Sequence, residues 1–126
     1  MGKEKTINSI VERVSITQFT KSLKPAAKDY FTPRELKNLN CCADQTWAGF
    51  FAVKRALIRL FNSIIELENA QITELSFELR HDTNGAPIIS EFPDHVKESS
   101  NFTRSNFHIS ITHNRHNAIG LASFQR

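Results

Sequence analysis

The longest uninterrupted helical pattern in the sequence extends from Asp44 to Glu68, and it limits the fold more than any other segment. Its apolar residues recur mostly at steps of three and four, which is the spacing of a helix with one buried stripe. These residues are Trp47, Phe50, Phe51, Leu57, Ile58, Phe61, Ile64 and Ile65. No proline interrupts the segment, and Asp44 or Thr46 can cap its first turn. We therefore predict one long helix with its apolar stripe in the core.

Three cations lie between the apolar positions of this helix. Lys54 and Arg55 are adjacent, about 100° apart around a helix, whereas Arg55 and Arg59 stand one turn apart on the same face. The pattern by itself favours a core helix whose long cationic side chains extend to solvent.

A strand and two short helices are expected before the long helix. Residues Thr6–Ile16 are rich in β-branched side chains and predict a first strand, although their spacing also allows a helical turn. Thr17–Leu23 predicts a short helix that Pro25 stops. Thr32 is a natural N-cap, and Glu35 at the third helical position completes a capping box. This second helix is expected to end near Asn40.

After the long helix the hydrophobic period changes to that of strands. Apolar and polar residues alternate in Ile72–Arg80 and in Phe107–Thr112, which predicts two half-buried strands. Ala86–Phe92 and Ala118–Phe124 are expected to form two further strands. In the first of these four segments, Leu75, Phe77 and Leu79 are expected to face the core. Asn84 and Gly85 are typical of a tight hairpin turn. The pattern predicts a single α+β domain over residues 1–126, with one long helix packed on an antiparallel sheet and short helices before it.

Composition places the chain among small proteins without a membrane segment. Its 126 residues are enough for one core but too few for two domains. No apolar run approaches the roughly 20 residues of a membrane-spanning helix. The net charge of +3 and the pI near 9.1 favour acidic partners or phosphorylated ligands slightly, and they fall short of a nucleic-acid-binding signature. The adjacent Cys41 and Cys42 cannot form a useful bridge, so we expect reduced thiols and a cytoplasmic protein.

Two smaller groups of polar residues have both a structural and a functional interpretation. One is a basic stripe at roughly helical spacing, formed by Arg13, Lys21 and Lys24. It suits an acidic partner, although such a stripe is more often a solvated face. The other consists of the three histidines between residues 108 and 116, whose H-x₄-H-x₂-H spacing is not a standard zinc pattern. We expect no metal site there.

Four motifs in register resemble the holo-acyl-carrier-protein synthase type of 4′-phosphopantetheinyl transferase. The segment WAGFFAVKRALIRLF is similar to the family's A-G-R-F-A-A-K-E-A-x-x-K-A-F, and NSIVE is similar to its G-x-D-I-V-E. FTPREL also matches, as does HDTNGAP followed by FHISITHNRHNAIG, which resembles the family's N-G-x-P and S-I-[ST]-H motifs. The matching segments are Asn8–Glu12, Phe31–Leu36, Trp47–Phe61, His81–Pro87 and Phe107–Gly120. The resemblance therefore covers nearly the whole chain and implies the fold of that family.

The resemblance also implies an activity and its ligands. The family transfers the phosphopantetheine arm of coenzyme A to a serine of an acyl carrier protein in fatty acid biosynthesis, with Mg²⁺ bridging the pyrophosphate. It implies coenzyme A as the substrate, an acyl carrier protein as the partner, and a homotrimer with sites at the subunit interfaces. Lys54, Arg59 and His113 match two lysines and a histidine of the family motifs, and the resemblance assigns them to coenzyme A binding.

Both metal-binding carboxylates of the family are replaced in this chain. The aspartate falls on Ser9 and the glutamate falls on Arg55. A guanidinium about 4 Å from Mg²⁺ repels it by several kcal/mol even at an effective dielectric constant near 20. In addition, Phe50 replaces an arginine, and residues 62–66 replace a glycine-rich segment. The two usual metal positions therefore carry no metal ligand.

Three functions follow from these patterns, and the sequence does not decide between the first two, so the enzymatic activity stays open. In the first, Arg55, Lys54 and Arg59 clamp the pyrophosphate and so replace part of the metal's charge. Glu12 or His116 then acts as the base. In the second, the protein binds a carrier protein, coenzyme A or an active partner subunit without chemistry. The third, a small nucleic-acid binder, is least favoured because the aromatic residues occupy core positions.

Overall fold

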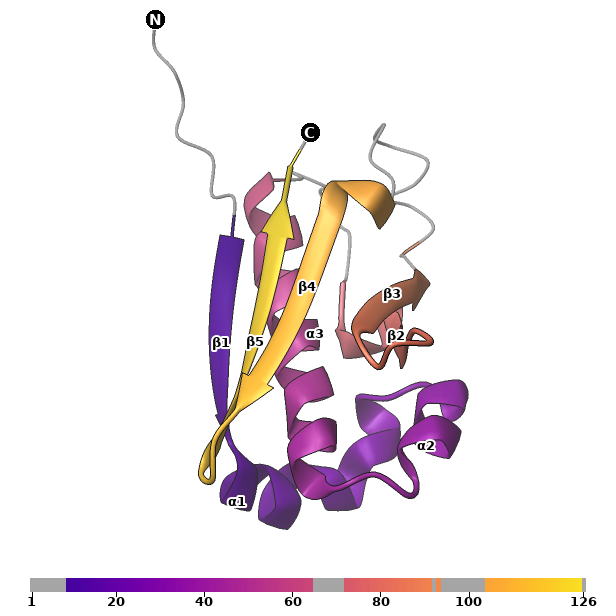
Figure 1. Ribbon diagram of the computed structural model, residues 1–126, viewed down its shortest axis with the longest axis vertical. Helices are drawn as coiled ribbons and strands as arrows, with labels where there is room; N and C mark the ends of the chain where they lie inside the picture. Colours follow the sequence, from indigo (N-terminus) through magenta and orange to yellow (C-terminus); the bar gives the residue numbers. More distant parts are fainter. Residues whose placement is uncertain (1–8, 65–71, 92, 94–103, 126) are drawn as a thin grey trace, which may run out of the picture.

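The structure is a computed structural model, and it describes residues 9–64, 72–91, 93 and 104–125 (Figure 1). The chain begins with strand β1 (Ser9–Ser15), followed by the short helical segments α1 (Ile16–Gln18), η1 (Phe19–Leu23), η2 (Lys24–Asp29) and α2 (Pro33–Leu39). The long helix α3 (Asp44–Ile64) comes next. The remaining elements are η3 (Glu74–Ser76), β2 (Glu78–His81), β3 (Pro87–Glu91), η4 (Arg104–Asn106), β4 (Phe107–His113) and β5 (Asn117–Phe124).

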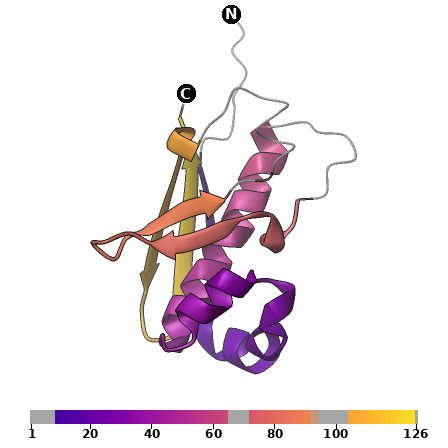
Figure 2. The same ribbon diagram turned by 90° about the vertical axis from the view of Figure 1, so that its right-hand side faces the viewer.

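The strands form two antiparallel sheets, with helix α3 packed on one face of the larger one. The larger sheet has the order β1-β5-β4, and the smaller one is the β2–β3 hairpin. Figure 2 shows the hairpin running across the direction of the three long strands. The predicted α+β class, with a long helix on an antiparallel sheet and short helices before it, is confirmed.

Helix α3 approaches the sheet closely because glycines face it. A Cβ atom on Gly120 of β5 would lie 2.4 Å from the backbone nitrogen of Val53 and 2.6 Å from the carbonyl carbon of Ala52. Gly49 on the helix meets the side chain of Ile111 on β4 in the same way. The large side chains therefore pack around this contact, and Phe61 stacks on Phe107 with ring centroids 4.6 Å apart.

The predicted capping box at the start of α2 is confirmed. The Thr32 hydroxyl accepts a hydrogen bond from the Glu35 backbone N–H, and the Glu35 carboxylate accepts one from the Thr32 backbone N–H. Pro33 occupies the first turn, where its missing N–H costs nothing. For α3, the residues beyond Ile64 in the predicted range lie outside the described part of the chain.

The short helix predicted over Thr17–Leu23 is present as α1 and η1, which end at Leu23. Pro25 lies in the first turn of the next segment, η2, where a helical segment tolerates proline. One prediction on secondary structure was wrong. The strand predicted over Ile72–Arg80 begins only at Glu78, and Leu75 is 46% exposed instead of core-facing. Residues 74–76 instead form a 3₁₀ turn in which the Glu74 carbonyl accepts a hydrogen bond from Lys54, a long-range contact that overrides the local alternation.

Candidate functional site

Arg55 is one of two exposed cations on helix α3, and it stands at the position of the family's metal-binding glutamate. Its guanidinium carbon lies 5.6 Å from the centre of the Phe51 ring, one turn earlier on the helix. Arg55 lines a cavity of about 340 Å³ between α3, the end of β1 and the segment that follows β1. The cavity is lined by Arg13, Val14, Ser15, Gln18, Phe19, Ser22, Leu23, Phe51 and Arg55.

Arg59, one turn beyond Arg55, forms an ion pair with Glu12 of β1. The Arg59 Nη1 and Glu12 Oε2 atoms are 2.5 Å apart. Side chains alternate between the two faces of a strand, so Glu12 points toward α3 together with the partly buried Ile10 and Val14. The structure therefore brings two predicted site residues into contact, a candidate base and a candidate coenzyme A ligand.

Ser9 and Arg55, which match the family's two metal positions, are not brought together. Ser9 and Val11 are exposed and lie on the face of β1 that points away from α3. In addition, Ser9 stands four residues from Arg13, which is about 13 Å along a strand. Among the described residues, no group of three His, Cys, Asp or Glu side chains is placed to hold a metal ion. A divalent cation thus does not fit the residues at these two positions.

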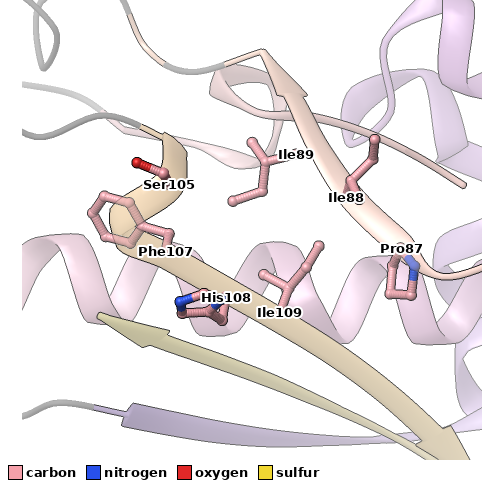
Figure 3. Close-up of a pocket in the computed structure, with 7 residues that line it drawn as sticks. All are labelled: Pro87, Ile88, Ile89, Ser105, Phe107, His108 and Ile109. Carbon is pink, nitrogen blue, oxygen red and sulfur yellow. The ribbon is translucent and has the colours of Figure 1, made fainter. Parts of the chain in front are cut away.

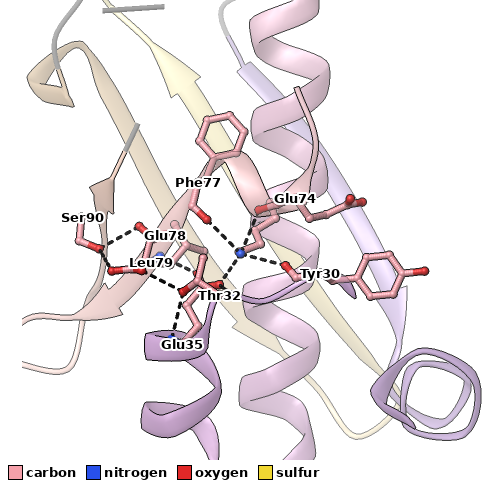
Figure 4. A network of polar contacts seen from close by, with 9 residues as sticks. Tyr30, Thr32, Glu35, Glu74, Phe77, Glu78, Leu79 and Ser90 are labelled. Atoms are coloured by element: carbon pink, nitrogen blue, oxygen red, sulfur yellow. Dashed lines mark hydrogen bonds and ion pairs between the residues drawn. The ribbon is translucent and has the colours of Figure 1, made fainter. Parts of the chain in front are cut away.

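Lys54 is completely buried, with 0% of its side chain exposed. Its ammonium forms an ion pair with the Glu35 carboxylate and donates hydrogen bonds to three backbone carbonyls (Figure 4). The carbonyls are those of Tyr30, Glu74 and Phe77, at 3.0, 3.0 and 3.1 Å. Four acceptors therefore surround the ammonium, which has three hydrogens. In this single chain, the group that the resemblance assigns to coenzyme A is enclosed by the protein.

Glu35 is the equally buried partner of Lys54. Its two carboxylate oxygens accept hydrogen bonds from the backbone N–H groups of Thr32 at 2.9 Å and Leu79 at 2.7 Å. Burial raises the pKa of the Glu35 carboxyl and lowers the pKa of the Lys54 amine, and their mutual attraction offsets only part of each shift. The pair joins α2, α3 and β2, so it supports the helix that carries Arg55.

Glu78 extends the same polar network toward β3. Although strand alternation predicted it on the polar side, only 9% of it is exposed. Its carboxylate accepts hydrogen bonds from the Thr32 hydroxyl at 2.9 Å and from the Ser90 hydroxyl at 3.3 Å, and Arg34 lies 3.4 Å away. Sequence reasoning found Glu35 only as part of a capping box, and it missed the burial of Glu35 and Glu78 because their long-range partners lie far along the chain.

His113 lies at the end of the sheet that is nearest to the Arg55 cavity. It is opposite Ala118, and Ala118 is opposite Val14, which lines the cavity. Two strand spacings, about 10 Å, separate His113 from Val14 across the sheet. His116 in the next loop is exposed, and its backbone carbonyl accepts a hydrogen bond from the Ile16 N–H at 2.9 Å. His108 is exposed near the opposite end of β4.

Lys24, a member of the predicted basic stripe, is bound to other side chains. Its Nζ atom lies 2.7 Å from a carboxylate oxygen of Asp44 and 5.0 Å from the centre of the Trp47 ring. The ion pair keeps the pKa of Asp44 below its usual range. Arg13 and Lys21 remain exposed. The stripe therefore presents two cations instead of three.

A second cavity, which the sequence did not indicate, lies between the two sheets (Figure 3). Its volume is about 580 Å³, and strands β3 and β4 line it. The lining residues are Pro87, Ile88, Ile89, Ser105, Phe107, His108 and Ile109. The lining is mainly apolar, and Pro87 belongs to one of the motifs that carry the family resemblance.

Comparison with solved structures gives the fold. Holo-acyl-carrier-protein synthase from Neisseria meningitidis superposes with a TM-score of 0.76 at 18% identity, over 94% of this chain and 98% of that one. The Helicobacter pylori enzyme, crystallised with coenzyme A, gives 0.73 at 21% identity, over 93% and 99%. The enzyme from Plasmodium yoelii gives 0.74 at 14% identity, over 97% of both chains. The chain has the holo-acyl-carrier-protein synthase fold.

The synthase fold is shared at sequence identities near 20%, so the similarity lies in the arrangement of elements. No protein-family model and no curated protein sequence matches the chain. The synthases are covered almost end to end, which leaves no large part of their fold without a counterpart here. Within the described residues, none of the helices combines the length and the apolar character that a membrane crossing requires.

Proposed function

We propose that this protein is a phosphopantetheinyl transferase of the holo-acyl-carrier-protein synthase type, with coenzyme A as donor and an acyl carrier protein as acceptor. The observation that carries the proposal is the near end-to-end superposition on such synthases, including ones crystallised with coenzyme A. Four sequence motifs in the same order support it independently. The reaction belongs to fatty acid biosynthesis, and we place it in the cytoplasm.

In the proposed reaction, the carrier serine hydroxyl attacks the phosphorus that bears the pantetheine arm. The bond to the 3′,5′-ADP half of coenzyme A breaks, and the serine proton passes to a base. Glu12 is our candidate for that base, because its carboxylate lies beside α3 and Arg59 holds it in place. The loop residue His116 is the alternative base.

The remaining site residues are assigned by position. Arg55, Arg59 and His113 are proposed to contact coenzyme A, because they lie along α3 and at the adjacent end of the sheet. For Lys54 we propose an indirect role in binding and catalysis, because its ammonium holds Glu35 and three carbonyls and thereby fixes α3 beneath the site. No step requires Mg²⁺, since neither Ser9 nor Arg55 offers a carboxylate.

We also propose that the active form is a homotrimer with sites at the subunit interfaces. The face of the sheet that α3 does not cover carries an apolar strip formed by Val11, Ile119 and Leu121. Val11 of β1 lies opposite Leu121 of β5, and Ile119 lies two residues before Leu121 on the same face of β5. Val11 is 56% exposed in the single chain, which is unusual for a valine in a strand. Contact between copies of the chain would remove this strip from water.

Transfer is tested directly by mass spectrometry. The protein is incubated with coenzyme A and an apo acyl carrier protein, once with Mg²⁺ and once with EDTA. A gain of one phosphopantetheine group on the carrier supports the proposal, and its absence in both conditions refutes transfer.

The second candidate is a homologue that binds the same partners without chemistry. The absence of a carboxylate at positions 9 and 55 favours it. A protein that binds coenzyme A or carrier protein by calorimetry but never modifies the carrier has this function. A variant of this idea is a mixed trimer in which an active partner subunit supplies the missing carboxylate.

A further inference from the structure

The tip of the β2–β3 hairpin carries the only Asn–Gly pair in the sequence. Asn84 and Gly85 are both exposed, and Figure 2 shows the turn projecting from the body of the molecule. Gly85 has a φ of 86° and open space where a Cβ atom would stand. Neither residue lines one of the two cavities described above. The turn therefore presents a pair of residues whose chemistry the proposed function does not use.

An asparagine that precedes a glycine loses its side-chain amide without an enzyme. The Gly85 backbone nitrogen attacks the side-chain carbonyl carbon of Asn84, and the new C–N bond closes a succinimide ring. The bond from that carbon to the amide nitrogen breaks, and this nitrogen leaves as ammonia with the proton of the Gly85 N–H. Water then opens the ring at either carbonyl and leaves aspartate or isoaspartate. Glycine favours the attack because it has no Cβ atom to shield its nitrogen, and asparagine belongs to the thermolabile residues.

The folded turn holds the attacking nitrogen in place. The Gly85 N–H donates a hydrogen bond to the Asp82 carbonyl at 3.0 Å. One carboxylate oxygen of Asp82 accepts hydrogen bonds from the backbone N–H groups of Asn84 at 2.8 Å and Ala86 at 2.9 Å. The Asp82 N–H donates in turn to the Ala86 carbonyl at 2.8 Å. Because the Gly85 nitrogen has to lose its proton and approach the Asn84 side chain, the attack requires this set of bonds to open.

The Asp82 side chain is the strongest of the groups that keep the turn closed. Hydrogen bonds to an ionised acceptor are roughly twice as strong as those between neutral groups, and the Asp82 carboxylate accepts two of them. An exposed hairpin tip also opens locally at a lower cost in free energy than the whole domain. The frequency of this opening therefore limits the reaction, and Asp82 sets that frequency.

We propose that Asn84 is a site of spontaneous deamidation and that Asp82 controls its rate by keeping the hairpin turn closed. The reaction places a new carboxylate beside that of Asp82, and like charges at this distance repel each other. The isoaspartate product also lengthens the backbone between residues 84 and 85, so the Asp82 carboxylate loses the spacing that lets it bind both N–H groups. Modification thus loosens the hairpin irreversibly. This inference does not rest on the proposed function.

Peptide mass spectrometry of the full chain tests the proposal. The natural protein and the variants Asp82→Ala, Asp82→Asn and Thr83→Ala are incubated at neutral pH, once folded and once in urea. The conversion of amide to acid at position 84 is followed with time, and circular dichroism verifies that each variant is folded without urea. Hydrogen exchange of the same peptide measures how often the turn opens.

Two controls isolate the contribution of glycine. Asn114 is also exposed in a hairpin turn, but Arg115 follows it, so a side chain shields the attacking nitrogen. Gly85→Ala adds such a side chain next to Asn84, and it is compared in urea, where strain of the folded turn plays no part. In urea, both controls should convert more slowly than Asn84 of the natural chain.

We expect Asn84 to convert at least about tenfold faster in urea than in the folded protein, because the closed turn is lost. In the folded state, Asp82→Ala should raise the rate by about tenfold and speed hydrogen exchange, since two hydrogen bonds to a carboxylate are removed. Asp82→Asn retains a neutral acceptor and should have a rate between those two proteins. Thr83→Ala changes only an exposed side chain of the same turn and should stay within about twofold of the natural rate.

Three results would overturn the proposal. Equal rates in urea and in the folded protein would show that the turn gives no protection. A folded Asp82→Ala variant that converts no faster than the natural protein would exclude Asp82 as the controlling residue, and Asp82→Asn decides the same point if Asp82→Ala does not fold. Conversion of Asn114 as fast as Asn84 in urea would show that the Asn–Gly pair has no special reactivity.

Discussion

Replacement of Glu35 by glutamine tests how far the fold depends on its buried ion pair. Both carboxylate oxygens accept hydrogen bonds, one from Lys54 and the Thr32 N–H and the other from the Leu79 N–H. Glutamine has one acceptor oxygen, so its NH₂ group must face one of these donors. It also leaves the Lys54 ammonium buried among neutral carbonyls.

The expected loss is large relative to the stability of a small domain. Removing one partner of a buried ion pair costs about 3–5 kcal/mol, because the remaining charge stays buried and uncompensated. Domains of this size are stable by only about 5–15 kcal/mol. With an m-value near 2 kcal/mol/M, the urea midpoint should fall by about 2 M.

Urea unfolding at pH 7, followed by circular dichroism, measures this loss. Glu12→Gln is the matched control, because its partner Arg59 is 58% exposed and such a pair contributes at most about 1 kcal/mol. Comparable small losses for Glu35→Gln and Glu12→Gln would refute the reasoning, since they would show that burial gives the Lys54 pair no special weight.

The pH dependence of the Glu35→Gln variant gives an independent check. Attraction to Glu35 is the largest influence that raises the pKa of Lys54, and burial already holds that pKa below its ordinary value of 10.5. Removing Glu35 lowers it further. A group whose pKa is lower in the folded state than in the unfolded state contributes stability that is fully present above its unfolded pKa. That stability is lost as the pH falls through its folded pKa. The variant should therefore regain stability relative to the natural protein as the pH rises from 7 toward 10.5, and a constant deficit would contradict this.

Three further perturbations examine the contacts that position the site. Gly120→Ala places a methyl group against the backbone of Val53 and should lower the free energy of unfolding by about 1–3 kcal/mol, whereas Gly85→Ala has open space and should lose only the roughly 1–2 kcal/mol of its positive φ. Thr32→Ala removes the N-cap of α2 and should lower the free energy of unfolding by about 1 kcal/mol, measured by the same urea unfolding, and a neutral result would contradict the capping box. Val11→Asp puts a charge in the apolar strip of the sheet and should reduce the particle mass to that of one chain by light scattering. An unchanged mass would exclude this face from a subunit interface.

The sequence by itself determined the features that depend on neighbouring residues. The capping box of Thr32 and Glu35, the long helix from Asp44 and the hairpin turn at Gly85 each follow from side chains within a few positions of one another. Gly85 has a φ of 86°, which glycine adopts without strain. Motif order along the chain was also enough to indicate the synthase fold, because it follows the order of the elements.

Only the tertiary structure decided which charges are buried and which remain free. Lys54 and Arg55 are neighbours in the chain, yet one has 0% exposure inside an ion pair and the other lines an open cavity. The sequence cannot separate them, because the partner of Lys54 lies 19 residues away and most of the residues that line the cavity around Arg55 lie on other elements. A helix turns by about 100° per residue, so adjacent side chains face different surroundings, and packing against distant segments gives each its role.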